Sequence, residues 1–100
     1  MPPTIDPEKY YIVRTYSAGV FFAKIVSVEG DEVAMNESIK LHYWDGAAAV
    51  EQLAVDGTSK PQNCRFTVPV DGSIVKGWIQ FLPCTEKAIK SLKGVVPWQK

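Results

Sequence analysis

Alternation of apolar and polar positions predicts strands along most of the first half of the chain. Four segments rich in aromatic and β-branched residues fit strands, at residues 10–16, 20–29, 32–35 and 39–44. Ser17-Ala18-Gly19 predicts a hairpin loop with glycine in the left-handed position, and Gly30-Asp31 predicts a turn. The first half is therefore predicted to form a meander. In its last strand, one face carries Ile39, Leu41 and Tyr43, and the other carries Lys40, His42 and Trp44.

Helical spacing of apolar residues predicts two short helices. The first is expected to begin with Asp45 as its N-cap and to end at Gly57, and its core stripe is Val50, Leu53 and Ala54. The second is expected to begin after the capping residue Thr85 and to run to Lys93.

Two further strands are expected between the helices, after an irregular loop over residues 58–65. They are residues 66–70 and 73–82, joined by a hairpin at Asp71-Gly72, and Pro69 places the first of them at a sheet edge. The pattern therefore predicts an α+β fold: an antiparallel, strand-rich sheet of about six strands with two short helices. Residues 1–9 hold three prolines and predict an extended arm, and residues 10–98 a single domain.

Composition places the chain among ordinary globular domains. Its 100 residues suffice for one domain, and 46% of them are hydrophobic and 22% charged. No apolar run approaches the roughly 18 residues of a membrane span, and the start does not read as an export signal. We therefore expect a cytoplasmic protein.

The net charge of zero hides an asymmetry between the two halves. Residues 1–59 carry four basic and nine acidic side chains (4 − 9 = −5), and residues 60–100 carry seven basic and two acidic ones (7 − 2 = +5). The split permits a basic face for an anionic partner, and it equally permits pairing of the halves within the fold or between subunits.

Residues that carry chemistry are sparse. Cys64, Cys84 and His42 are the only cysteines and histidine, they lack zinc-finger spacing, and a structural role is the simpler interpretation for all three. His42 has no serine, cysteine or carboxylate beside it in sequence, so nucleophilic catalysis is disfavoured. We therefore expect a binding protein with no catalytic residue, metal or cofactor.

Two bends combine aromatic and small residues, at residues 16–19 (Tyr-Ser-Ala-Gly) and 43–47 (Tyr-Trp-Asp-Gly-Ala). Aromatic faces stack on bases, and small residues let backbone N–H groups approach a phosphate. The simpler interpretation of the same bends is structural: a hairpin loop and a capped helix start. Only two arginines are present, which disfavours double-stranded nucleic acid and leaves a short single strand or a nucleotide open.

Three segments carry a family resemblance: IVRTYSAGVF (12–21), YWDGAAAVEQLAVDGT (43–58) and PCTEKAIKSLKG (83–94). They resemble a family of small proteins encoded by tailed bacteriophages and prophages. The chain also resembles the phage anti-Thoeris sponge proteins. The second resemblance implies sequestration, without chemistry, of a cyclic ADP-ribose immune signal or a cyclic oligonucleotide. It also implies homo-oligomers with sites between subunits, in the cytoplasm of the bacterial host. One departure is the stretch 38–42, where only Lys40 is basic and the family commonly has adjacent arginines.

The resemblance and the two bends together give a set of expected ligand contacts. Tyr16, Tyr43 and Trp44 would stack on the base, Arg14, Lys60 and Arg65 would meet phosphates, and Asp45 and Asn63 would contact sugar or base edges. This hypothesis requires the two bends to converge on one concave surface. The alternatives are a protein–protein adaptor that uses an open sheet edge or the lysine face of the second helix, and a binder of short single-stranded nucleic acid.

Overall fold

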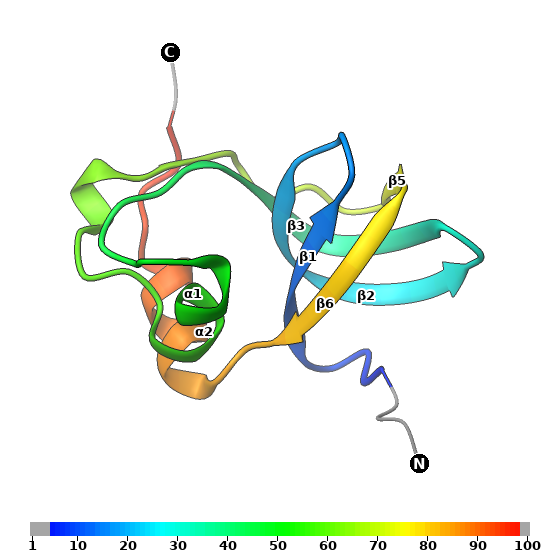
Figure 1. Cartoon of the computed structure of the whole chain (residues 1–100), viewed down its shortest axis with the longest axis horizontal. Coiled ribbons are helices and arrows are strands. Elements are labelled where there is room, and N and C mark those ends of the chain that lie inside the picture. Colours follow the sequence, from blue (N-terminus) through cyan, green and yellow to red (C-terminus); the bar gives the residue numbers. More distant parts are fainter. Residues whose placement is uncertain (1–4, 99–100) are drawn as a thin grey trace.

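The computed structural model describes residues 5–98 and shows, within them, six strands and two α-helices (Figure 1). The strands are β1 (Tyr10–Thr15), β2 (Val20–Glu29), β3 (Glu32–Tyr43), β4 (Arg65–Phe66), β5 (Ser73–Lys76) and β6 (Trp78–Pro83). The helices are α1 (Val50–Asp56) and α2 (Glu86–Lys93), and the short 3₁₀ turn η1 covers Pro61–Asn63. All strand pairs are antiparallel, which confirms the predicted α+β class.

The sheet curls until its two ends are nearly joined. Its order is β4-β3-β2-β1-β6, and β5 also pairs with β3. Only Gly77 separates β5, on the β3 edge, from β6, on the β1 edge. Gly77 has φ 79°, and its N–H donates to the Asp31 carbonyl oxygen (2.8 Å). The prediction of a single strand over residues 73–82 is therefore wrong, because the chain turns at this glycine and crosses between the two edges.

A bulge in β3 accounts for two further differences from the prediction. The strands expected at residues 32–35 and 39–44 are one strand, which continues through Glu37 although its φ is +50°. The Asp71-Gly72 bend is not a hairpin, because the residues flanking it both pair with β3. The Asp71 carboxylate instead accepts the Glu37 backbone N–H (2.9 Å). The position of the bend is therefore set by the bulge in β3. Of the strand predicted at residues 66–70, only Phe66 lies in a strand, β4, and Val70 forms an isolated bridge with Ser38.

The first helix begins later than its sequence predicts. Its N-cap is Ala49, which makes no side-chain capping bond, and the Asp45 carboxylate instead accepts the N–H of Gly46 and the amide of Asn63. The predicted end at Gly57 and the predicted cap at Thr85, whose hydroxyl accepts the Ala88 N–H (3.1 Å), are confirmed.

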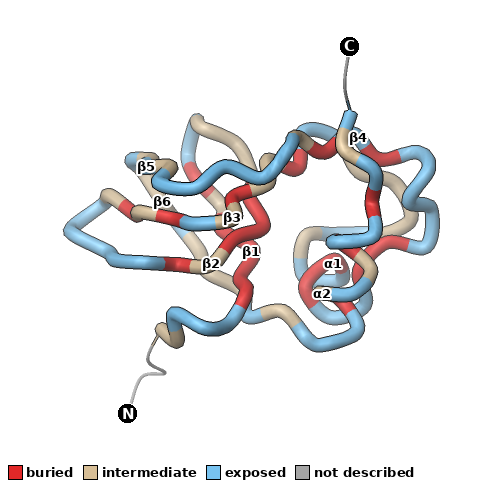
Figure 2. Tube along the Cα trace, turned by 180° about the vertical axis from the view of Figure 1, so that it is seen from behind, coloured by how far each residue is buried: buried red, intermediate tan, exposed pale blue. Residues whose placement is uncertain are grey.

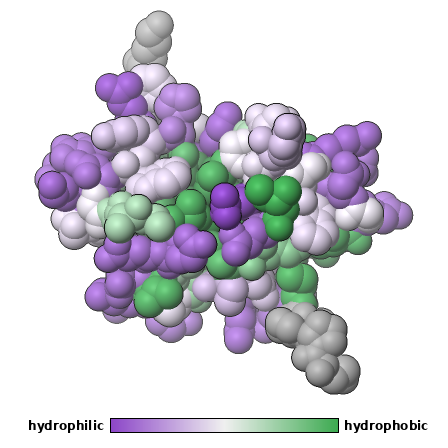
Figure 3. Space-filling view, viewed as in Figure 1, coloured by the Kyte–Doolittle hydropathy of each residue, from purple (hydrophilic) through white to green (hydrophobic). Residues whose placement is uncertain are grey.

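Two hydrophobic clusters lie on opposite faces of the sheet, and β1 contributes to both (Figure 2). Tyr10 and Ile12 face α1 and α2, whereas Tyr11 and Val13 face the inside of the curl, where Ile5 also packs. Part of the predicted N-terminal arm thus lies against the sheet, and residues 1–4 lie outside the described part of the chain. On the face seen in Figure 3, hydrophobic residues gather between the helices and β6, with hydrophilic ones around the rim. No helix among residues 5–98 is long and apolar enough to cross a membrane.

The Glu37 bulge makes stability depend on pH in the acid range. The Tyr10 hydroxyl donates to the Glu37 carboxylate (2.6 Å) and the Lys24 ammonium lies 3.3 Å away, so the pKa of Glu37 is lowered. The ionised carboxylate therefore stabilises the fold above the unfolded pKa of about 4.3, and this contribution is lost as pH falls through the lower folded pKa.

Glu37→Gln is therefore expected to be less stable than the natural protein at pH 7, by a margin that shrinks as the pH falls from about 5 to 3. Urea denaturation at each pH measures the margin. Glu29→Gln, in an exposed position of β2, is the matched control for loss of a carboxylate. A margin for Glu37→Gln that does not change with pH would contradict the assignment.

Candidate ligand-binding groove

A groove opens where the end of β3 meets β4, the η1 turn and the C-terminal segment. Its volume is about 810 Å³, within the range of small-molecule sites. Its lining combines aromatic, cationic, amide and carboxylate side chains: His42, Tyr43, Asp45, Gln62, Asn63, Cys64, Arg65 and Trp98. Most of these residues are exposed, so the groove is open to solvent.

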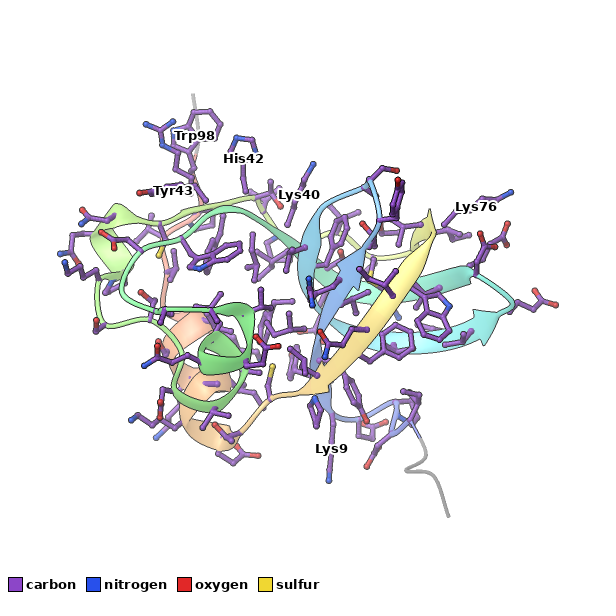
Figure 4. The ribbon with its side chains drawn as sticks, viewed as in Figure 1. Lys9, Lys40, His42, Tyr43, Lys76 and Trp98 are labelled. Carbon is purple, nitrogen blue, oxygen red and sulfur yellow. The ribbon has the colours of Figure 1, made fainter. Side chains whose placement is uncertain are left out.

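Aromatic and cationic groups form one side of the groove. The rings of His42 and Trp98 are parallel within 2°, with centroids 6.2 Å apart, and the Arg65 guanidinium carbon lies 5.4 Å from the Trp98 ring centroid. Trp98 is held in place by its backbone N–H, which donates to the Phe66 carbonyl oxygen (2.8 Å). In Figure 4 the side chains of His42 and Trp98 stand out side by side, with Tyr43 next to them. Such a surface suits a planar, anionic ligand.

Asp45 provides the polar side of the groove. Its carboxylate accepts the Asn63 side-chain amide (3.0 Å) and the Gly46 N–H (2.8 Å), and these two bonds lower the pKa of Asp45, with the charge of Lys60 acting in the same direction. The carboxylate therefore stays ionised at neutral pH. Each oxygen keeps a free lone pair, so Asp45 can accept ligand N–H or O–H groups.

Buried contacts fix the loop that carries this carboxylate. The Thr58 hydroxyl donates to the Asp45 carbonyl oxygen and accepts the Lys60 N–H (3.0 Å), while the Cys64 thiol lies within 3.7 Å of the same carbonyl. Thr58 and Cys64 are both buried. The residues after β3 and the residues before β4 are thus tied together beneath the groove.

The part of the chain that supplies most of the groove is also covered by a family model. The model, described as Domain of unknown function (DUF6948), matches residues 8–92. The chain belongs to this family. The match includes every groove residue except Trp98. No curated protein and no solved structure matches the chain. The resemblance to phage sponge proteins stays a prediction.

The structure brings together half of the residues predicted to contact a ligand. Four of them line the groove: Tyr43, Asp45, Asn63 and Arg65. Lys60 lies close enough to Asp45 for its charge to lower the pKa of the Asp45 carboxyl group. The remaining three residues lie elsewhere.

Arg14, Tyr16 and Trp44 do not line the groove. Trp44 packs against the hydrophobic cluster beneath the helices, because the strand alternation stops at Tyr43. Arg14 donates to the Gln80 side chain of β6 (2.7 Å). Tyr16 is 86% exposed on the β1–β2 loop, and its N–H donates to the Gly77 carbonyl oxygen. The hypothesis required the two bends to converge on one concave surface, and they do not.

Sequence reasoning missed four groove residues, His42, Gln62, Cys64 and Trp98. Strand alternation did place His42 on the face of Lys40, but nothing in the sequence indicated that the C-terminal segment returns to β4. Trp98 lies beyond Lys93, where the last predicted element ends, and no motif marked it. The parallel ring pair joins residues 56 positions apart, and local patterns do not report such a contact.

The remaining predicted chemistry is dispersed. Cys64 lies at the base of the groove, whereas Cys84 packs beneath the helices, where burial raises the pKa of its thiol to about 12. Residues 5–98 contain no group of three or more histidine, cysteine or acidic side chains arranged for a metal. The outer edge of the sheet exposes Val68, Val70 and Ile74, the kind of edge that the adaptor hypothesis expected, and that hypothesis stays a prediction.

Proposed function

We propose that this chain is a non-enzymatic binding protein that sequesters a small, nucleotide-derived anion in the groove. The observation that supports this most strongly is the juxtaposition of the parallel His42 and Trp98 rings with the Arg65 guanidinium. A base can stack on exposed aromatic rings, and a guanidinium is the side chain best suited to a phosphate. No ion pair involves Arg65 among residues 5–98, so its charge is available to a ligand.

The polar side of the groove supplies contacts for the rest of a nucleotide. The ionised Asp45 carboxylate repels phosphate and accepts hydroxyl or N–H groups, which places the sugar or a base edge on this side. The phosphate then belongs on the opposite side, beside Arg65. Tyr43, which pairs with Arg65 across β3 and β4, lines the groove, is 53% exposed and offers a second stacking surface. The groove would thus orient a nucleotide from one end to the other.

The resemblance to phage sponge proteins gives this proposal its finer form. It favours cyclic ADP-ribose or a cyclic oligonucleotide as the sequestered immune signal, bound without chemical change in the cytoplasm of an infected or lysogenic bacterium. It also favours a homo-oligomer in which a second subunit covers the open side of the groove.

Isothermal titration calorimetry with cyclic ADP-ribose isomers and cyclic di- and trinucleotides tests this function. We expect binding of at least one compound. Arg65→Gln is expected to weaken it about tenfold or more, since a hydrogen bond to a charged group contributes about 1.5–3 kcal/mol. Trp98→Ala is expected to lose about 1–3 kcal/mol of stacking.

Lys9→Gln is the matched control, because Lys9 is an exposed cation on the far side of the molecule from the groove (Figure 4). It is expected to bind like the natural protein. Absence of binding across the whole series of compounds, or equal losses in Arg65→Gln and Lys9→Gln, would contradict the proposed function.

A further inference from the structure

The groove is one end of a longer row of side chains, formed by Arg65, Trp98, His42 and Lys40. The first three are the stacked groups of the groove, and Lys40 follows because it lies two residues before His42 in β3 and its side chain projects from the same edge of the molecule (Figure 4). Alternate residues on a strand are about 6.5–7 Å apart. In Figure 4 Lys40, His42 and Trp98 project from the same edge of the molecule, one after another. We call these four residues the aromatic row.

Lys40 lies outside the groove and extends the row toward the β1–β2 loop. It is not among the groove-lining residues, and its side chain lies against Gly19, where an added Cβ would be 2.8 Å from the Lys40 Cε atom. Among residues 5–98, Lys40 takes part in no ion pair. The row therefore has an available cation at each end and two aromatic rings between them.

From this order of groups we infer that the aromatic row binds a linear, single-stranded oligonucleotide, with bases on His42 and Trp98 and phosphates at Arg65 and Lys40. The inference rests on the proposed function, because one nucleotide of the strand occupies the groove. Cations combined with aromatic faces are the means by which proteins follow a single strand, since every base offers a ring face and every linkage a charge.

The length of the row suits a linear strand, which can occupy the groove and continue beyond it to Lys40. His42, Arg65 and Trp98 are exposed, and Trp98 retains 53% of its surface. A mononucleotide in the groove would leave Lys40 without a contact, whereas a strand that leaves the groove past His42 reaches it. Because stacking and charge read no base edges along the row, we expect little sequence preference outside the nucleotide beside Asp45.

Fluorescence anisotropy with 5′-fluorescein-labelled thymidylates of two, four and eight nucleotides tests this inference. We expect affinity to rise with length and to fall as salt rises. Lys40→Gln is expected to weaken binding of the eight-nucleotide strand and to reduce the slope of log K against log salt by about 0.7, the value for one phosphate contact on a single strand. Trp98→Ala is expected to weaken binding by about 5- to 150-fold.

Two controls separate this inference from the proposed function. Lys9→Gln removes an exposed cation far from the row and is expected to leave both affinity and salt slope unchanged. An unlabelled cyclic dinucleotide, used as competitor, reports on the groove alone, and Lys40→Gln is expected to leave its affinity unchanged.

The possible outcomes are distinct. Length-dependent binding that is weakened by Lys40→Gln and not by Lys9→Gln supports the inference. Binding of the cyclic dinucleotide without tighter binding of the eight-nucleotide strand overturns the inference and leaves the proposed function standing. If the strand binds and Lys40→Gln has no effect, the inference that the strand runs along the row to Lys40 is overturned. Failure of every nucleotide to bind overturns both.

Discussion

Replacing Gly57 with alanine is expected to lower the free energy of unfolding by about 2–6 kcal/mol, the sum of a backbone cost and a steric cost. Gly57 ends α1 with φ 74° and ψ −152°, a region that residues with a side chain rarely adopt. A Cβ at this position would also lie 2.3 Å from the Ser91 Cβ atom of α2. The added methyl group would push α1 and α2 apart, and this would disturb their packing over the sheet.

Gly72→Ala is the matched control for this substitution. Gly72 has the same φ of 74°, but nothing lies within 4 Å of an added Cβ. It is therefore expected to cost only the backbone strain of about 1–3 kcal/mol. Urea denaturation midpoints, compared at an unchanged slope, measure both variants. An equal loss in the two would show that the contact with Ser91 carries no cost.

The features that the sequence predicted correctly are local. The Ser17-Ala18-Gly19 loop, the helix end at Gly57 and the cap at Thr85 each depend on residues within one turn of the chain. In these cases the residue type decides the backbone conformation by itself: glycine adopts positive φ, and threonine accepts an N–H three residues ahead. The antiparallel meander followed because its turns and strand alternation are local as well.

The features that the sequence mispredicted depend on a partner far along the chain. Asp71-Gly72 is a typical hairpin sequence, but the Asp71 carboxylate accepts the backbone N–H of Glu37, in the bulge 34 positions earlier. Asp45 is a residue type that commonly caps helices, but its carboxylate accepts a hydrogen bond from the side-chain amide of Asn63, 18 positions later. In both cases a tertiary hydrogen bond competes with the local one, and residue type does not reveal which bond forms.

The candidate site was only half predictable for the same reason. Asp45 and Asn63 were identified separately, as a residue of a bend and a residue of a loop, and the fold brings them together. His42 and Trp98 became partners because the C-terminal segment hydrogen-bonds to β4 at Phe66. The groove therefore depends on a strand of only two residues, and the stability of β4 and the binding of ligand should be coupled.

Phe66→Ala is expected to lower the free energy of unfolding by about 3–5 kcal/mol, the usual cost of removing a buried phenylalanine side chain. Phe66 is 1% exposed, pairs with Leu41 and belongs to the cluster that also holds Leu53 and Leu92. The loss is a large part of the 5–15 kcal/mol that stabilises a typical domain. Phe66→Leu keeps much of the volume and is expected to cost less than about 1.5 kcal/mol.

The same substitution should also release Trp98, and hydrogen exchange measures this directly. The Trp98 amide is protected by the Phe66 carbonyl oxygen, whereas the Ile12 amide lies in β1, which is paired with β2 on one side and β6 on the other. In Phe66→Ala we expect protection of the Trp98 amide to fall more than that of Ile12, because β4 loses its only buried side chain and opens before the sheet unfolds. Equal losses at the two amides would show that β4 and the meander open together, and the groove would then be as stable as the sheet itself.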